Sequence, residues 1–177
     1  MQMSVGTVFW ITGLPRSGKT TLANALCERL RSQNRAVVAL DGDTFREACG
    51  GDLGYDEASR LQNAKRLSGM CRLISSQGFI VVCSTVSLIA EIHDLNRSTL
   101  ARYVEVLVRV PNETLKRRDP ELYGAAARGE IPLPGVNQSF SLPPRPEIVF
   151  EAFDAELELD SAVNKILELL ESPDLRA

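Results

Sequence analysis

The chain has 177 residues, of which 44% are hydrophobic and 24% charged, and its 20 basic and 23 acidic residues leave a formal net charge of -3. This composition is that of a globular protein with a filled core; it excludes disordered, collagenous and coiled-coil chains and gives no overall charge that would attract nucleic acid. No apolar run approaches the roughly 20 residues that a membrane span needs, and the sequence does not begin with a secretory leader. We therefore expect one cytoplasmic domain, without a nucleic-acid or membrane partner.

Short apolar runs alternate with helical patterns along most of the chain. The apolar runs at residues 7–12, 36–40, 79–83 and 104–110 are predicted buried strands, and residues 147–150 look like a fifth strand. The helical patterns cover residues 19–31, 56–77 and 88–100, and a closing helix is predicted from a cap at Asp160 to about Leu170. Because parallel neighbours need crossover connections, this alternation predicts an α/β fold with helices on both faces of a parallel sheet.

Three smaller expectations accompany this architecture. Asp56 should cap the helix that follows it, and the apolar stripe of that helix should be Leu67, Met70, Leu73 and Ile74. We expect Trp10 in the core and His93 in solvent. The four cysteines form no CxxC pair, which predicts buried reduced thiols at Cys27, Cys49, Cys71 and Cys83.

The alternation breaks between residues 119 and 146. This stretch is rich in proline and glycine, including Pro120, Gly124, Pro132 and Pro134. A long irregular segment inside a compact domain is usually functional, and we expect it to be a lid over a site.

The residues after the first predicted strand read GLPRSGKT and match the P-loop pattern GxxxxGK[ST] at each fixed position. Such a loop, which opens a helix, directs backbone N–H groups at phosphate oxygens. Lys19 would contact the β- and γ-phosphates of ATP, and the Thr20 hydroxyl would hold Mg²⁺. The alternative, without any phosphate binding, is a chance glycine turn with a solvated lysine. The predicted ATP-binding residues here are Gly13, Arg16, Ser17, Gly18, Lys19, Thr20 and Thr21.

Two carboxylates, Asp41 and Asp43, follow the second predicted strand. The carboxyl ends of parallel strands meet at one edge of the sheet, so these side chains should lie near the P-loop. A carboxylate there can orient an attacking hydroxyl or hold the water shell of a metal. An ordinary solvated turn is the alternative, because Asp and Gly favour turns.

Further along the chain, Arg60, Asn63 and Arg66 recur at intervals of three residues on a predicted helix. This spacing favours one helix face, on which two guanidiniums and an amide could bind phosphate or sulfate oxygens. A solvated polar face is the alternative.

Taken in order, several blocks resemble adenylyl-sulfate kinases over roughly residues 5–150. The blocks are GLPRSGKTTLA, LDGDTFRE, DLGYDEASRLQNAKR, the turn at Ser87, RDPELY, RGEIPLPGVN and PPRPEIVFE. These enzymes use ATP to phosphorylate the ribose 3′-hydroxyl of adenosine 5′-phosphosulfate. The resemblance implies a single P-loop kinase domain over 1–177, a mobile lid, a small nucleotide acceptor as partner and, because such kinases are often dimers, a homodimer.

The resemblance also implies roles for individual residues. Asp43, with Asp41 close by, would lie near the acceptor hydroxyl, and Ser87 falls where the family has a serine sometimes described as phosphorylatable. The acceptor side would comprise Asp43, Arg46, Tyr55, Arg60, Asn63, Arg66, Ser87 and Leu133, with Tyr55 stacking on the base. Arg118, in an RDP motif, would lie close to bound ATP.

The chain departs from the family pattern at the acceptor side. An arginine expected after the turn at Ser87 is replaced by Ala90, and LPGVN stands where the family has FTGID, so that Leu133 replaces a second stacking aromatic and Asn137 a carboxylate. Base stacking on an aromatic side chain contributes about 1–3 kcal/mol, so this loss would weaken adenine selection. Phe140 could supply the missing face. The segment from Cys83 to Leu88 resembles a branch that includes cytidine diphosphoramidate kinases.

The functional hypothesis is transfer of the ATP γ-phosphoryl group to a ribose hydroxyl of a small anionic nucleotide. A cytidine-diphosphate-linked acceptor is the first alternative, and a non-catalytic ATP-binding regulatory module is the second. A nucleotide-hydrolysing switch is disfavoured, because no apolar strand ends in DxxG and no NKxD element is present.

Overall fold

The structure, a computed structural model, describes residues 4–172. Five parallel strands form one sheet in the order β2-β3-β1-β4-β5. The strands are β1 (Val8–Thr12), β2 (Val37–Asp41), β3 (Ile80–Thr85), β4 (Tyr103–Arg109) and β5 (Ile148–Glu151). The helices are α1 (Lys19–Ser32), α2 (Gly42–Ala48), α3 (Glu57–Ser75), α4 (Ala90–Thr99), α5 (Asn112–Arg118), α6 (Pro120–Ala127) and α7 (Ala155–Glu171).

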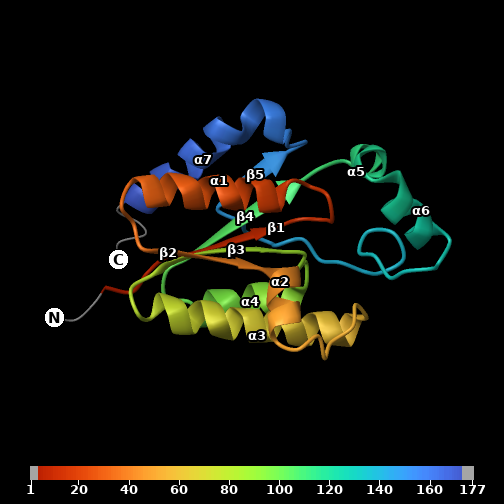
Figure 1. Cartoon of the computed structure of the whole chain (residues 1–177), viewed down its shortest axis with the longest axis horizontal. Coiled ribbons are helices and arrows are strands. Elements are labelled where there is room, and N and C mark those ends of the chain that lie inside the picture. Colours follow the sequence, from red (N-terminus) through yellow and green to blue (C-terminus); the bar gives the residue numbers. More distant parts are fainter. Residues whose placement is uncertain (1–3, 173–177) are drawn as a thin grey trace.

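Helices α1 and α7 cover one face of the sheet and α3 and α4 the other, while α5 and α6 project beyond the end of the sheet at which β4 ends (Figure 1). The predicted α/β fold, a parallel sheet flanked on both faces, is therefore confirmed. Because the central strand β1 is buried on both faces, its sequence is apolar from Val8 to Ile11. Phe9 and Ile11 pack with Leu22 of α1, and Trp10 packs on the opposite face with Leu67 of α3.

Strand β2 is only half-buried, so the prediction of a fully buried second strand is wrong. It lies at the edge of the sheet and pairs with β3 alone. The apolar run at residues 36–40 resembles a central strand, and only the sheet order shows that it lies at an edge.

Two helices differ from their predicted patterns. Asp56 caps α3 as expected, but Leu73 is 57% exposed, because the inward face of the helix carries Ala64, Leu67 and Cys71. Helix α7 begins at Ala155, one turn and a half before the predicted start. Its cap is Asp154, which accepts a hydrogen bond from the backbone N–H of Glu156.

The segment 119–146, for which the word lid is used below only as a label, is not wholly irregular, which corrects that prediction. Its first part forms α6, because Asp119 caps the helix by accepting from the N–H of Leu122 at 2.9 Å and Pro120 occupies the first helical turn. Proline is tolerated there, since its missing N–H would have no partner within the helix. Among the described residues from 128 to 146, the only strand-like pairing joins Pro134 and Gln138.

His93 is buried, with 1% of its surface exposed, so its predicted place in solvent is wrong. It lies on the inner face of α4, where its Nδ1 is 2.6 Å from Glu105 Oε1 and its Nε2 is 3.1 Å from the carbonyl oxygen of Ser141. His93 thus connects β4 to the segment 119–146 at Ser141.

Other sequence-based expectations have mixed outcomes. Trp10 is buried, as are the free thiols of Cys27, Cys71 and Cys83. Cys49 is also free but exposed, contrary to prediction, because it follows the short helix α2 at the surface. Within residues 4–172, no helix has the length and apolarity that a bilayer span requires.

Candidate active site

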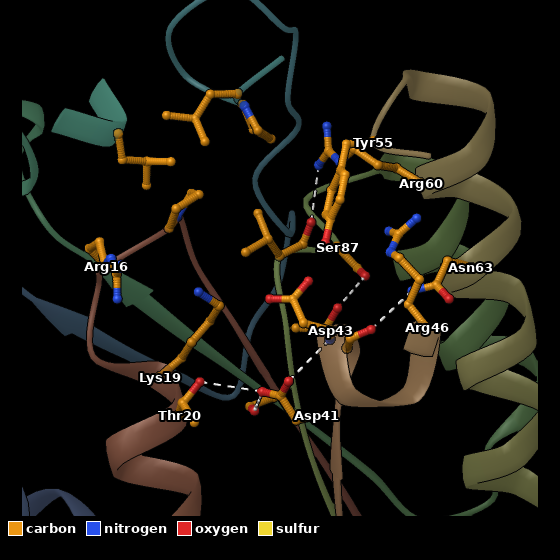
Figure 2. Close-up of a pocket in the computed structure, with 18 of the residues that line it drawn as sticks. Arg16, Lys19, Thr20, Asp41, Asp43, Arg46, Tyr55, Arg60, Asn63 and Ser87 are labelled. Carbon is orange, nitrogen blue, oxygen red and sulfur yellow. Dashed lines mark hydrogen bonds between the residues drawn. The ribbon is translucent and has the colours of Figure 1, made fainter. Parts of the chain in front are cut away.

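A cavity of about 610 Å³ lies at the carboxyl ends of the strands, between the P-loop, helices α2 and α3 and the lid. Most of the predicted site residues line it, although they come from segments far apart in the sequence (Figure 2). Those that do are Arg16, Gly18, Lys19, Thr20, Asp41, Asp43, Arg46, Tyr55, Arg60, Asn63, Ser87 and Leu133.

Several positions of the P-loop restrict the type of residue that can occupy them, through close backbone contacts or positive φ angles. A Cβ atom on Gly13 would lie 2.4 Å from the carbonyl oxygen of Val108, so no side chain fits there. Gly18 has a φ of 96° and Arg16 a φ of 65°, both in the left-handed region. The loop ends at the N-terminus of α1, where the first N–H groups lack helical partners and the helix dipole is positive. This is the geometry of an anion-binding loop.

Lys19 is buried beside this loop, with 8% of its surface exposed. Its Nζ donates a hydrogen bond to the carbonyl oxygen of Leu14 at 3.1 Å. Burial lowers the pKa of Lys19 to about 8, although the charges of Asp43 and Asp41 oppose the shift. In Figure 2 the side chain extends from the loop into the cavity beside Asp43.

Asp41 links the P-loop to the second and third strands. Its Oδ2 accepts hydrogen bonds from the hydroxyls of Ser84 at 2.8 Å and Thr20 at 3.4 Å, and its Oδ1 caps α2. Carboxylate and hydroxyl oxygens beside a phosphate site are the ligands that Mg²⁺ prefers, and Mg²⁺ is commonly held by one or two carboxylates together with substrate phosphates. Thr20 and Asp41 therefore fit Mg²⁺.

Asp43 lies between the P-loop side of the cavity and the side that α2 and α3 form. Its backbone N–H donates to Asp41, whereas its exposed carboxylate makes no hydrogen bond with any residue from 4 to 172. Figure 2 shows it between Lys19 on one side and the Arg46 and Asn63 side chains on the other. The carboxylate is free to accept a proton or a hydrogen bond from a ligand.

Two arginines lie on the side of the cavity that α2 and α3 form, opposite the P-loop. Each has 8% of its surface exposed. Arg46 donates to the carbonyl oxygens of Leu53 and Gly54, and Arg60 donates to that of Val86 at 3.0 Å. Neither guanidinium has a carboxylate within 4.0 Å in the described part of the chain. Burial, followed by the charge of Arg46, lowers the pKa of Arg60. Two buried cations with neutral partners are suited to bind an anion.

The remaining acceptor-side residues surround these arginines. The guanidinium of Arg46 lies 4.5 Å from the centre of the Tyr55 ring, and the ring is 54% exposed. Asn63 donates to the carbonyl oxygen of Gly42 at 3.3 Å, while its buried Oδ1 has no partner in the described chain. The hydroxyl of Ser87 lies 2.9 Å from that of Thr85, and Leu133 contributes a buried aliphatic wall.

Arg66 does not reach the cavity, which corrects the prediction that it binds the acceptor. Both of its terminal nitrogens bond to the carboxylate of Asp52, at 2.7 and 2.8 Å. Steps of three residues fall short of a full turn, so six residues rotate the side chain about 120° around the helix from Arg60. At this spacing Asn63 still lines the cavity, whereas Arg66 lies outside it.

Some predicted ATP-binding residues shape the P-loop and do not line the cavity. Gly13 and the buried Ser17 form its inner part, and Thr21 is exposed on α1. Arg118 donates to the carbonyl oxygens of Arg16 at 3.2 Å and Phe153 at 2.8 Å. Arg118 therefore stabilises the P-loop backbone and does not line the cavity.

The lid is fastened to the same loop. Arg16 forms an ion pair with Asp119 at 2.7 Å. The hydroxyl of Tyr123 donates to the carbonyl oxygen of Pro15 at 2.8 Å, and burial raises the pKa of Tyr123 to about 12. These contacts join α6 to the outer edge of the P-loop.

Sequence reasoning missed several residues that line the cavity or contact its arginines. Ser84 and Thr85 line the cavity at the carboxyl end of β3, a place that the rule for parallel sheets could have indicated. Gln138 bonds to Arg60 across 78 residues of sequence, and no local pattern signals such a contact. Phe140, a candidate for the missing aromatic face, is 40% exposed and does not line the cavity.

Comparison with known proteins adds to this geometry. The family model described as adenylylsulphate kinase matches residues 5–151. The adenylyl-sulfate kinase of Gloeothece citriformis is 36% identical over 168 residues, which cover 94% of each chain. The bifunctional enzyme NodQ of a Rhizobium species is 40% identical over 145 residues, which cover 80% of this chain and 22% of that longer protein.

Among solved structures, the APS kinase of Mycobacterium tuberculosis in complex with AMPPNP and APS superposes with a TM-score of 0.86. The two sequences are 31% identical, and the match covers 95% of this chain and 99% of the other. Because the family model, the relatives and the fold agree over nearly the whole chain, the protein belongs to the adenylylsulphate kinase family of ATP-dependent phosphotransferases.

Proposed function

We propose that the chain transfers the γ-phosphoryl group of ATP to the ribose 3′-hydroxyl of a small anionic nucleotide, with adenosine 5′-phosphosulfate as the first candidate. The observation that carries the proposal is the meeting, in one cavity, of a P-loop and two buried arginines without a carboxylate partner in the described chain. Family membership supports the same class of acceptor.

In the proposed reaction the acceptor hydroxyl oxygen attacks the γ-phosphorus in line, and the bond to the departing ADP oxygen breaks. Asp43 orients the hydroxyl and accepts its proton. Lys19 neutralises charge on the phosphates, and Arg46 and Arg60 hold the acceptor anion. Thr20 and Asp41 would hold Mg²⁺, which supplies further neutralisation of the phosphate charge.

A cytidine-linked acceptor such as cytidine diphosphoramidate is the second candidate. The observation that favours it is that Tyr55 is the only aromatic residue among those lining the cavity, and that Leu133 provides an aliphatic wall. One stacking face selects less strongly for a large purine than two do.

A coupled assay of ADP release with ATP and a panel of acceptors tests the proposal. We expect turnover with at least one nucleotide of the panel, and the base of the preferred substrate decides between the two candidates. Tight ATP binding without turnover of any nucleotide would refute the proposed reaction and support a regulatory module. Thermal shifts with ADP, Mg²⁺ and each acceptor give an independent order of preference.

We further propose that residues 1–177 act as one kinase domain in the cytoplasm and that residues 119–146 act as its lid. The homodimer implied by resemblance stays a prediction, which light scattering of the purified chain would test.

A further inference from the structure

Gln138 lies in the lid, yet its side chain joins two acceptor-side segments. Its Oε1 accepts a hydrogen bond from Nη1 of Arg60 at 2.9 Å, and its Nε2 donates to the carbonyl oxygen of Tyr55 at 3.0 Å. The partners fix the orientation of the amide, because a guanidinium can only donate and a carbonyl can only accept. Both ends of the amide are therefore used.

The backbone of Gln138 closes the turn that carries Leu133 into the cavity. Its N–H donates to the carbonyl oxygen of Leu133 at 3.2 Å, and its own carbonyl oxygen accepts from Gly135 at 3.1 Å. Asn137 strengthens the turn, since its Oδ1 accepts from the N–H of Leu133 at 2.7 Å. A shift of Gln138 would therefore move a wall of the cavity as well as Arg60.

The amide positions Arg60 without cancelling its charge. Arg60 has five N–H donors, of which one bonds to Gln138 and one to the carbonyl oxygen of Val86. The other three make no hydrogen bond with residues 4–172. A carboxylate at position 138 would form an ion pair with the guanidinium and reduce its attraction for an acceptor anion.

We propose that Gln138 is a positioning residue for the acceptor nucleotide: it fixes the guanidinium of Arg60 against the base platform at Tyr55 when the lid lies over the cavity. The inference rests on the proposed function, because the anion that Arg60 receives belongs to the acceptor. Since Gln138 contacts neither Lys19 nor Thr20, its effect is confined to the acceptor half of the site.

The test compares Gln138→Ala, Gln138→Glu and a matched control, Ser139→Ala, in the full chain. Ser139 also joins the lid to α3, through a hydrogen bond to Glu57 at 2.8 Å, but it does not contact Arg60. We expect Gln138→Ala to raise the acceptor KM about tenfold and Gln138→Glu to raise it roughly a hundredfold. The KM for ATP should change less than about twofold in every variant, and Ser139→Ala should leave the acceptor KM within about threefold of wild type.

The outcomes separate this inference from the proposed function. Absence of turnover by the wild-type chain refutes the proposed reaction, and calorimetric titration with adenosine 5′-phosphosulfate in the presence of ADP then tests Gln138 by affinity alone. Equal affinity in wild type and Gln138→Ala, equal losses in Gln138→Ala and Ser139→Ala, or a parallel rise in the KM for ATP would each overturn the positioning role. If the wild-type chain binds no acceptor nucleotide, the inference falls together with the proposed function.

Discussion

At the donor end of the cavity, formed by the P-loop, one arginine forms an ion pair, whereas at the acceptor end neither Arg46 nor Arg60 forms one with residues 4–172. Lys19 interacts with the charges of Asp43 and Asp41, and Arg16 pairs with Asp119. Arg46 and Arg60, by contrast, bond to backbone carbonyls and to an amide. The fold thus supplies counter-ions for its phosphate loop and leaves the acceptor to supply the missing negative charge on the other side. The following predictions test that difference.

The largest effect is expected at the donor end. Lys19→Ala removes the cation that faces the phosphates, so turnover should fall by at least about a thousandfold, whatever the acceptor. The fold should persist, because the substitution also removes a charge that burial disfavours. A coupled assay and a thermal melt of the same preparation measure both effects. Activity within tenfold of wild type would remove Lys19 from its role.

Arg60 and Arg66 offer a matched pair on one helix. Arg60→Ala should raise the acceptor KM about a hundredfold with little change in the KM for ATP, because a charge-assisted contact is lost. Arg66→Ala should leave both constants near wild type, since Arg66 is bound to Asp52 outside the cavity. Steady-state kinetics with each substrate varied in turn measure the difference. Similar losses in the two variants would mean that the acceptor site extends to Arg66.

The pH dependence of activity and of stability should reveal the buried ammonium of Lys19 at the donor end. The folded pKa of Lys19 is about 8, so kcat/KM for ATP should fall about tenfold per pH unit above that value as the ammonium is lost. Stability should change in the opposite direction. Between pH 8 and 10.5 the unfolded lysine still holds the proton that the folded one has released, and the contribution of Lys19 to stability therefore rises with pH.

A Lys19→Met variant is the control for this profile. It should lose the rise in stability, measured by denaturant unfolding at several pH values, while the wild type keeps it. A wild-type kcat/KM that stays constant to pH 10 would contradict the assigned role of the buried ammonium.

The smallest effect is expected where the lid meets the P-loop. Tyr123→Phe removes only the hydrogen bond to the carbonyl oxygen of Pro15 and keeps the ring in place. We expect a rise of about threefold in the KM for ATP, the scale of one neutral hydrogen bond, and an unchanged acceptor KM. The same kinetic experiment measures both constants. A change in the acceptor KM alone would mean that Tyr123 acts at the acceptor end of the cavity.

The P-loop at the donor end could be predicted from sequence because its residues are contiguous. The P-loop is one segment of the chain, and its strand and helix follow from local apolar patterns. The acceptor end combines segments from α2, α3, the end of β3 and the lid, so helix spacing placed Arg60 and Asn63 correctly and misplaced Arg66. Gln138 and the buried His93 depend on contacts between distant segments, and their environments become visible only in the folded chain.

The lid is held at two places, by Tyr123 and Asp119 at the P-loop and by His93 at the carbonyl oxygen of Ser141. The exposed residues of the loop between these two anchors can therefore change while the sheet stays as it is, whereas Leu133 packs into the core beside the sheet. Substrate preference can diverge in such a kinase through a few exchanges in one turn of the chain.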